Sequence, residues 1–528
     1  MSSIAIIGSG LAAVSAAKSL IQRGIKPVIL DVGENLDDKT QAVVTNMSKT
    51  DPEHWADADR ELVTASHTSK IKNQLPIKLA FGSDYFYGKS DGSLIQTDGV
   101  MLPYTYAKGG FSAGWGATVL PPDDCDLVDW PVKNEKLNQY YNHVLKDLPY
   151  SAAEDRLTTH FPLMSKKIDP INLTPGNDWI LQALNNSFDK KLEDITFGQA
   201  RVLTRSSDHS SNQGCKYCGC CMSGCVYDCI YKSSQDIDQM ISDKTIEYIP
   251  KTFVNSLIEK DNSVEISITN NNKQIETLRF DRVFLAAGAV GSTRILMSSR
   301  ELYAKEIRLK STAGFVAPML SIKRLISDWP EANTQPGIFL EYKLDSLSNH
   351  WVHTQLSTPN ELVYEKLGIK ANSKGVLSTI KKRFSEHLII AHGNLHSEHS
   401  NGYILKLIKS DKLGSDKLIS RREYIADPHI AIKNALKKLS FIGRKVGCHI
   451  LLPFVQDSIR TGGFHVGGTL PMKHNPQNVT DTNLLGNPLG WERVHIIDSS
   501  VFPSLPGTTI GLLAMANAAR IASEFELV

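Results

Sequence analysis

Two glycines near the start of the chain, Gly8 and Gly10, have the spacing of a dinucleotide-binding turn. They follow a short apolar run at residues 4–7, and a helical pattern that includes Ala13 comes after them. In such a turn Gly8 permits the tight bend, Gly10 lets a pyrophosphate approach the backbone, and Ala13 lets the helix pack closely on the strand. Asp31 ends the second apolar run and can hold a ribose hydroxyl. The motif therefore predicts a dinucleotide site, but it does not separate FAD from NAD.

A second group of reactive side chains is a cluster of cysteines. Six of the eight cysteines lie between residues 215 and 229, which indicates a local site and not a disulfide framework. Four of them have the C-x2-C-x2-C-x3-C spacing of an iron–sulfur cluster motif: Cys215, Cys218, Cys221 and Cys225. Three interpretations stay open, namely an iron–sulfur cluster, a structural loop without metal, and a four-cysteine zinc site.

Three segments farther along the chain also have the composition of binding sites. Residues 108–117 are too rich in glycine for a regular helix or strand, and they include Gly109, Gly110 and Ser112. Residues 465–472 read HVGGTLPM, and residues 497–509 read IDSSVFPSLPGTT. The last two segments resemble the two C-terminal signatures of the glucose–methanol–choline (GMC) oxidoreductase family. The glycine-rich loop, the Trp-Pro pair at 130–131 and the AAGA run at 286–289 resemble further segments of that family.

The resemblance implies an FAD-dependent enzyme that oxidises an alcohol. In the family, the histidine of the HxxGT segment faces the flavin and acts as the base, and His465 is the matching residue here. A neutral imidazole can accept the hydroxyl proton while the carbinol hydrogen leaves as hydride. The family usually has a second His or Asn about forty residues later, where this chain has Thr509, which can position a substrate but cannot act as a base near neutrality. The departure leaves open a different substrate, lost activity, or a base such as His495, for which we prefer a structural role.

The resemblance also assigns the cofactor contacts. It places Asp498 near the ribityl chain, the backbone of Thr508 and Thr509 near the flavin pyrimidine, and Val254 near the adenine, although Val254 could equally be a core valine. The 286–289 run adds Ala287 and Gly288 to the cofactor-binding residues. Some family members attach FAD through a histidine in the glycine loop. Residues 111–115 contain none, so we expect noncovalent FAD.

We therefore expect oxidation of an alcohol group on a sugar or other polyol, including one linked to a nucleotide or a lipid. One alternative is an iron–sulfur flavin dehydrogenase that passes electrons to a partner protein. The other is a non-redox flavoprotein such as a lyase, which the missing second His or Asn favours.

The charge balance argues against a nucleic acid partner, because 58 basic and 56 acidic residues give a net charge of +2. Residues 361–445 nevertheless hold 17 Lys and Arg against 8 Asp and Glu. This region could meet anionic lipid head groups or a phosphate-bearing substrate, or it could be a solvated face. The chain starts without a basic segment before its apolar stretch and has no long apolar run, so we expect a cytoplasmic protein, with contact at the inner face of a membrane as an alternative.

The order of the strand and helix patterns that would position these residues predicts an α/β fold. With 528 residues, of which 41% are apolar, the chain is long enough for two or three domains. We expect a doubly wound, Rossmann-like FAD-binding domain from residues 1–130, 215–312 and 455–528. An interleaved α+β substrate domain would comprise residues 131–214 and 313–454, and alternating runs at 387–392 and 402–408 predict an antiparallel sheet there. The pattern also predicts a strand at 494–498 and a final helix over about 511–524.

Overall fold

A parallel sheet carries the opening glycine turn. The computed structural model describes residues 3–65, 79–88, 95–97, 102–188, 193–208, 213–325, 331–344, 347–369, 375–410, 416–423, 428–458 and 463–526. Its five-stranded parallel sheet has the order β22 (Val494–Ile496), β11 (Arg282–Leu285), β1 (Ile4–Ile7), β2 (Val28–Leu30) and β7 (Glu247–Ile249). The central strand β1 is buried along its whole length, as expected for a parallel sheet covered on both faces.

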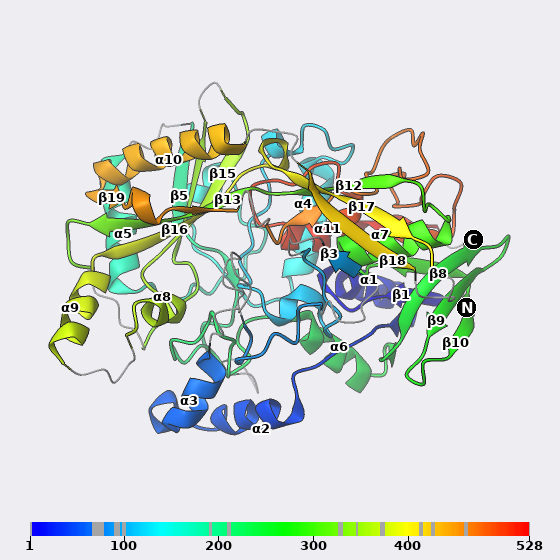
Figure 1. The fold of residues 1–528 in the computed structure, drawn as a ribbon, viewed down its shortest axis with the longest axis horizontal. Helices are drawn as coiled ribbons and strands as arrows, with labels where there is room; N and C mark the ends of the chain where they lie inside the picture. Colours follow the sequence, from blue (N-terminus) through cyan, green and yellow to red (C-terminus); the bar gives the residue numbers. More distant parts are fainter. Residues whose placement is uncertain are drawn as a thin grey trace.

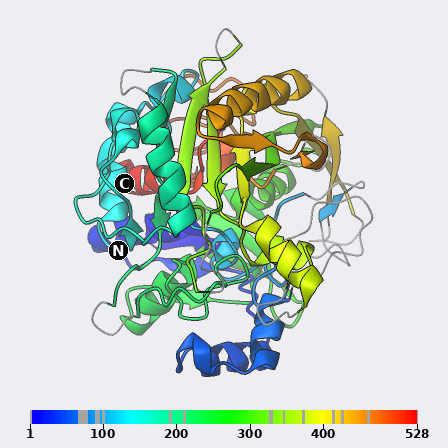
Figure 2. The same cartoon turned by 90° about the vertical axis from the view of Figure 1, so that its left-hand side faces the viewer.

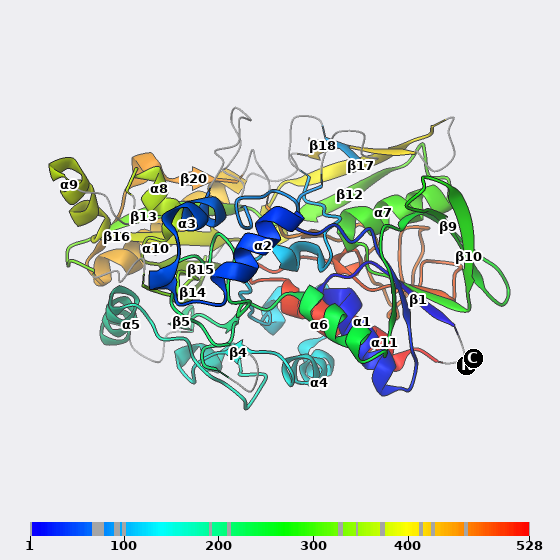
Figure 3. The same cartoon turned by 90° about the horizontal axis from the view of Figure 1, so that it is seen from below.

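Helices pack around this sheet at one end of the molecule (Figure 1). The first helix, α1 (Leu11–Gln22), packs against the last one, α11 (Gly511–Glu524), and against α6 (Ser233–Ser242). The inner face of α1 is built from small residues, Ala12, Ala13, Ala16 and Ala17, which permit close approach. On its other side α11 meets α4 (Asn134–Leu145). Figure 3 shows α1, α6 and α11 stacked together, with the two ends of the chain side by side.

A seven-stranded antiparallel sheet forms the other half of the molecule. Its order is β19 (Cys448–Ile450), β13 (Gly314–Ser321), β16 (Leu388–Asn394), β15 (Trp351–Ser357), β14 (Ile338–Lys343) and β5 (Ile195–Gln199), and β20 (Gln456–Asp457) also pairs with β13. Helices α5 (Pro175–Ser187) and α10 (Pro428–Lys445) cover one face, and Figure 2 shows them in teal and orange against the yellow-green strands. Helix α5 begins where Thr174 accepts a hydrogen bond from Asn177 N at 3.2 Å, with Pro175 in the first turn.

The two faces of this antiparallel sheet differ in chemistry. Because side chains alternate along a strand, the residues that contact α5 and α10 occupy every second position. This apolar face includes Phe315, Ala317, Leu340, Tyr342, Val352, Leu356, Ile389 and Ala391. The registers place Glu341, His353, Gln355 and His392 on the opposite face. A polar face therefore lies on the side of the sheet away from its helices.

Two further sheets complete the fold. A five-stranded sheet has the order β21 (Val466–Gly467), β12 (Glu306–Ser311), β17 (Gly402–Ile408), β18 (Lys417–Glu423) and β3 (Ile95–Thr97). A three-stranded antiparallel sheet comprises β8 (Phe253–Glu259), β9 (Val264–Thr269) and β10 (Ile275–Phe280). The remaining helices and strands are α2 (Asp38–Met47), α3 (Asp57–Thr64), α7 (Gly288–Ser299), α8 (Glu361–Lys366), α9 (Val376–Ser385), β4 (Tyr150–Ser151) and β6 (Val202–Leu203). Short 3-10 helices are η1 (Pro52–His54), η2 (Gly110–Ala113), η3 (Asp124–Leu127), η4 (Arg156–Thr159), η5 (Ser397–His399), η6 (Leu452–Phe454) and η7 (Ser499–Val501).

The predicted α/β class, with a parallel sheet and an antiparallel sheet, is confirmed. The predicted final helix matches α11. The division into two domains stays a prediction, and two of the sheets mix its segments. Strand β20, from residues assigned to the FAD-binding domain, pairs with β13 from residues assigned to the substrate domain. Strands β17 and β18, from residues assigned to the substrate domain, pair with β12 and β3 from residues assigned to the FAD-binding domain.

Candidate active site

The glycine turn after β1 packs closely against the residues that directly follow strand β11. Gly8 has a φ of +100°, and a Cβ there would lie 2.5 Å from the carbonyl oxygen of Ala286. It would also lie 3.3 Å from the Cα of Ala287. A side chain at position 8 would therefore push the turn away from the sheet. The structure thus brings the predicted residue Gly8 together with the predicted residue Ala287.

The two glycine segments predicted from the sequence meet each other. The backbone N–H of Gly109 donates a hydrogen bond to Ser9 Oγ at 2.9 Å. Gly110 has a φ of +60°, and a Cβ there would lie 3.2 Å from the Cα of Gly10. The two turns pack backbone to backbone beside the first residues of α1. Backbone this free of side chains, next to a helix N-terminus, is suited to the pyrophosphate of a dinucleotide.

Ser112 connects the glycine loop to helix α6. Its hydroxyl donates to the carbonyl oxygen of Gly109 at 2.6 Å and accepts from the backbone N–H of Ser233 at 2.9 Å. Both serines are buried. The predicted contact residue Ser112 therefore has a clear local role, because it fixes the shape of the loop that carries Gly109.

Asp31 lies at the end of β2, next to the opening turn. Its Oδ2 accepts hydrogen bonds from Ser9 Oγ and, at 3.0 Å, from the hydroxyl of Tyr248. Burial raises the pKa of Asp31 to about 6, against the lowering effect of these hydrogen bonds. The carboxyl group is held in one orientation beside the glycine turn, which fits the expected contact with a ribose hydroxyl. Sequence reasoning missed both Ser9 and Tyr248 as partners of Asp31.

Asp498 is the centre of a buried hydrogen-bond network. Its Oδ2 accepts from Ser292 Oγ at 2.5 Å, and its Oδ1 accepts from the hydroxyl and N–H of Ser500 at 2.6 and 2.9 Å. Burial raises the pKa of Asp498. Gly288 has a φ of +74°, and a Cβ there would meet no atom within 4 Å. The first residue of α7 therefore has open space beside its backbone.

Val254 is buried in β8. Its carbonyl oxygen accepts a hydrogen bond from the Arg294 guanidinium. The segment is joined to the end of β2, because Thr252 N donates to the carbonyl oxygen of Asp31 at 2.9 Å. Val254 thus lies near the predicted dinucleotide site while also contributing to the core, and the adenine contact stays a prediction.

The loop at 503–509 lies between the half of the molecule with the parallel sheet and the half with the seven-stranded antiparallel sheet. A Cβ at Gly507 would lie 2.8 Å from the carbonyl oxygen of Trp351 and 2.9 Å from that of Asn394, both in the antiparallel sheet. The hydroxyl of Thr509 accepts from Leu120 N at 3.1 Å. The Thr508 hydroxyl is buried and has no partner in the described part of the chain. Both threonines are therefore held where the halves meet.

His465 directly precedes β21. Its carbonyl oxygen accepts from Thr312 N at 3.2 Å, while its imidazole is only partly buried. The imidazole Nδ1 is shielded from solvent and has no hydrogen-bond partner among the described residues. Burial lowers the pKa of His465 to about 4, and the neighbouring His353 and His392 lower it further. The imidazole is therefore neutral at pH 7 and able to accept a proton.

The neighbours of His465 belong to the polar face of the antiparallel sheet. His353 Nδ1 lies 2.6 Å from Glu341 Oε1, with both side chains fully buried, and His353 Nε2 lies 3.1 Å from Gln355 Nε2. His392 is paired across the strands with Gln355 and is exposed, yet desolvation lowers its pKa to about 4. Sequence reasoning missed this group. The alternation of polar residues in β15 was the available signal.

His495 lies elsewhere, within the parallel sheet. Its ring stacks on Phe284 at a centroid distance of 4.9 Å and packs against Phe525. Its Nδ1 lies 2.9 Å from the carbonyl oxygen of Leu485. The contacts fit the structural role preferred for His495, and they leave His465 as the histidine beside the polar face.

The four cysteines of the predicted motif converge. Every pair among Cys215, Cys218, Cys221 and Cys225 is close enough for one thiolate to disfavour ionisation of the other. Burial raises the pKa of Cys215 to about 11, whereas a hydrogen bond from Cys229 lowers that of Cys225 to about 7. All eight cysteines are free thiols.

Three of these sulfur atoms accept hydrogen bonds from backbone N–H groups. Tyr217 N donates to Cys215 Sγ at 3.4 Å, and Cys229 N donates to Cys225 Sγ at 3.2 Å. Thr334 N donates to Cys221 Sγ at 3.3 Å. Such bonds stabilise thiolates that ligate a cluster. Among residues 213–325 and the other described ranges, no three of the sulfurs lie within 4.8 Å of one another, whereas a tetrahedral zinc site needs about 3.8 Å. The spacing is therefore wider than a single zinc ion requires.

The cysteine segment also touches the glycine loop. One pocket is lined by Ser112, Ala113, Gly114 and Trp115 of that loop together with Cys221 and Cys225. The Trp115 indole donates to the carbonyl oxygen of Tyr231 at 2.6 Å, and the ring also faces Gly511 at the start of α11. The predicted cysteine motif and the predicted cofactor loop are thus direct neighbours.

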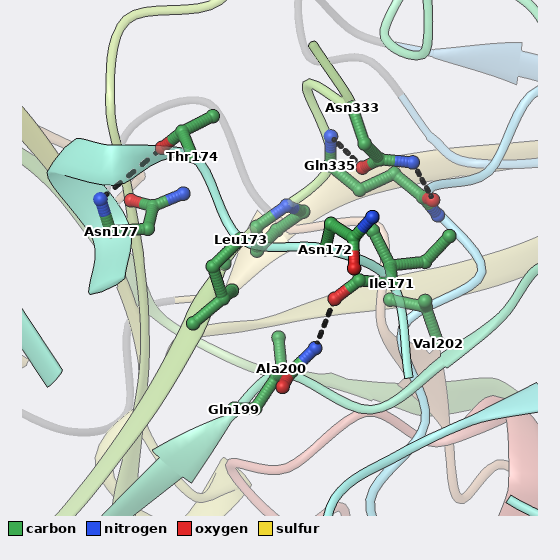
Figure 4. A pocket seen from close by; sticks show the side chains of 12 residues that line it. Ile171, Asn172, Leu173, Thr174, Asn177, Gln199, Ala200, Val202, Asn333 and Gln335 are labelled. Carbon is green, nitrogen blue, oxygen red and sulfur yellow. Dashed lines mark hydrogen bonds between the residues drawn. The ribbon is translucent and has the colours of Figure 1, made fainter. Parts of the chain in front are cut away.

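A second pocket lies beside the cysteine segment (Figure 4). Asn333 and Gln335 line it, and the Asn333 amide donates to Gln335 Oε1 at 3.2 Å, a bond drawn as a dashed line in Figure 4. The Asn333 amide also donates to Cys215 Sγ at 3.6 Å, and Gln335 donates to the carbonyl oxygen of Gly116 at 2.7 Å. None of the catalytic, cofactor-binding or cysteine residues predicted from the sequence lines this pocket, so we regard it as a support of the loops and not as the site.

In the part of the chain that is described, no helix is both long enough and apolar enough to cross a bilayer.

Comparisons with known proteins bear on the C-terminal segment and on the fold. Residues 444–518 match the family model described as GMC oxidoreductase. A similar solved structure is pyridoxine 4-oxidase from Mesorbium loti, with 14% sequence identity, a TM-score of 0.63, and 99% of each chain covered. No curated protein sequence matches the chain.

Proposed function

We propose that this chain, as an FAD-dependent GMC-type oxidoreductase acting on CH–OH groups, oxidises a neutral sugar or other polyol with His465 as the base. When bound, FAD supplies the acceptor for the hydride that leaves the carbinol carbon. The paired glycine turns, Asp31 and the Asp498 network would hold it. Residues 111–115 contain no histidine, so acid denaturation should release intact FAD.

The observation that carries the proposal is the neutral, partly exposed His465 next to the polar sheet face. A base must be unprotonated and within reach of the substrate hydroxyl. The lowered pKa of His465 supports the first condition, and its partly exposed imidazole supports the second. Thr509 would position the substrate, because its hydroxyl hydrogen stays available while its oxygen accepts from Leu120 N.

A neutral polyol fits the chemistry of the groups around His465. Gln355 supplies an amide, and His392 is neutral near pH 7 because its pKa is about 4. The Glu341 carboxyl is buried against His353 and does not face the substrate as a free charge. Uncharged donors and acceptors suit hydroxyl groups, whereas an anionic substrate would meet no fixed cation from these residues.

The test is replacement of the base. His465→Ala should keep FAD bound but slow anaerobic flavin reduction by about 10²-fold or more, because proton transfer loses its acceptor. His474→Ala, at an exposed position, is the matched control and should reduce its flavin at the normal rate. Stopped-flow absorbance with neutral polyols, pyranoses, a sugar phosphate and pyridoxine would measure both. An unchanged rate in His465→Ala would contradict the base assignment, and failure of every alcohol to bleach the flavin would favour the non-redox alternative.

A second candidate concerns where the electrons go. We propose that Cys215, Cys218, Cys221 and Cys225 hold an iron–sulfur cluster that carries electrons from the flavin to an acceptor protein. The pairwise convergence of the four thiols, the N–H bonds to their sulfurs and their contact with the glycine loop support it.

Iron and sulfide analysis tests this candidate. Anaerobically purified protein should contain both, with a broad absorption near ~400 nm besides the flavin bands. Cys221→Ser should lose iron, while Cys220→Ser, one residue away and outside the motif, should retain it. Protein with flavin and no iron would make the segment a structural loop, and would direct attention to oxygen as acceptor.

A further inference from the structure

Helix α9 presents an apolar face to solvent. The exposed fractions are 79% for Val376, 67% for Leu377, 59% for Ile380 and 44% for Phe384. Successive helix residues are about 100° apart, so these four side chains lie within an arc of about 100°. Of the ten residues of α9, only Ser385 is buried. A short helix is marginal in water without a packing partner, so this face is suited to one.

Cations border the apolar face on both sides. On the same helical wheel Lys381 and Arg383 lie just outside the two edges of the apolar arc, and Lys382 lies on the opposite face. None of the three forms an ion pair within the described ranges. A basic helix with an apolar stripe is the pattern of helices that lie in the interface of an anionic bilayer.

A neighbouring turn extends the same surface. Ile322 is 75% exposed and is followed by the exposed cations Lys323 and Arg324. The turn is fixed to the end of α9, because Arg324 Nε lies 2.7 Å from Glu386 Oε2 and Leu325 N donates to the carbonyl oxygen of Glu386 at 2.6 Å. Glu386 is therefore neutralised by Arg324. Lys323 and the cations of α9 therefore give this surface a net positive charge.

The surface continues along the adjoining sheet edge. Ile322 N donates to the carbonyl oxygen of Gly447 at 2.9 Å, directly after α10, where Arg444 and Lys445 are exposed. Farther along, Leu452 and Phe454 are 68% and 65% exposed. Figures 1 and 3 show α9 projecting from the end of the molecule that is opposite to β8, β9 and β10.

We propose that α9 and the turn at 322–324 are a docking surface for an anionic lipid bilayer. Positive charge around exposed apolar side chains complements acidic head groups above an acyl region. A second copy of the chain is a poorer occupant, because a two-fold contact through the apolar face would bring Lys381 and Arg383, which border it, close to the same cations of its partner. Of the basic residues of 361–445, those on α9 and at the end of α10 therefore belong to this surface, while strands β17 and β18 lie elsewhere (Figure 1).

Vesicle flotation with the full-length, FAD-loaded protein tests the proposal. Binding to vesicles of phosphatidylcholine with about 30% phosphatidylglycerol should be at least about tenfold stronger than binding to pure phosphatidylcholine. High salt should reduce it. The double variant Leu377→Asp/Ile380→Asp should lose about tenfold or more, and Lys381→Glu/Arg383→Glu should lose the preference for the anionic lipid.

The control replaces apolar residues of similar exposure at the other end of the molecule. Ile258→Asp/Ile275→Asp, at positions 50% and 41% exposed, should bind the vesicles as the unmodified protein does. The flavin spectrum and melting temperature of each variant show that it is folded. Absence of vesicle binding, or equal binding to both lipids, would overturn the proposal. Concentration-dependent dimerisation that the α9 double variant abolishes would instead assign the face to a second copy.

Discussion

At the scale of single residues, the proposed role of His465 as the base predicts a pH range for flavin reduction. Its pKa is lowered to about 4, so the neutral form persists well below the ordinary histidine value of about 6.5. We expect the limiting rate of anaerobic flavin reduction to be level from pH 8 to about pH 5 and to fall toward pH 4 as the imidazole gains a proton. Stopped-flow measurements across this range check it. A decline centred near 6.5 would mean that the imidazole is solvated in the working site.

The pair of Glu341 and His353 predicts a second residue effect. Glu341→Leu should lower the free energy of unfolding by about 1–3 kcal/mol, because the buried Nδ1–H of His353 would lose its acceptor. Glu341→Gln keeps an acceptor oxygen at that place and should retain most of the stability. Urea unfolding of the three proteins gives the comparison. Equal loss in both variants would show that the charge, and not the hydrogen bond, stabilises the pair.

Residue types and spacing were enough to propose one part of the candidate site, whereas the other part emerged only from the structure. Gly8, Gly10 and His465 each lie in a short sequence motif, so the residues next to them are enough to single them out. Glu341, His353 and His392 meet only through the registers of three neighbouring strands. A register is a tertiary property, and no local pattern in the sequence contains it.

At the scale of elements, the close packing of the Gly110 turn on the Gly10 turn predicts that an added methyl group at position 110 will reduce FAD binding. In Gly110→Ala the new Cβ would lie 3.2 Å from the Cα of Gly10, at a φ of +60° that side chains rarely adopt. The opening turn would be displaced, so the purified variant should contain much less FAD. Gly116→Ala, whose Cβ would meet nothing within 4 Å, is the control and should retain it. The ratio of flavin to protein absorbance measures both, and equal occupancy would show that the turns tolerate separation.

Individual elements were predicted better than their arrangement. The apolar periodicity of the last segment indicated helix α11, and alternation indicated the strands β16 and β17. Their neighbours could not be predicted, because β17 pairs with β12 nearly a hundred residues earlier. Long-range pairing depends on which faces need burial, and many partners satisfy a local pattern equally well.

At the scale of the whole molecule, Gly507 couples the two halves. In Gly507→Ala the added Cβ would approach the carbonyl oxygens of Trp351 and Asn394 at 2.8 and 2.9 Å. Backbone oxygens in a paired sheet move little, so we expect a lower melting temperature and slower flavin reduction with FAD still bound. Scanning calorimetry and stopped-flow absorbance measure the two effects. Unchanged values for both would show that the loop adjusts independently of the sheet.

The order of strands in the parallel sheet has a consequence for synthesis. Strand β1 emerges from the ribosome first, but its neighbour β11 begins at residue 282 and the sheet is closed by β22 at residue 494. At a synthesis rate of about 5–20 residues per second, β1 exists for on the order of half a minute or more before the last strand of its sheet is made. During that time the apolar residues 4–7 need another cover. The first strand of the sheet is therefore open to premature apolar contacts until residues 494–496 have been synthesised.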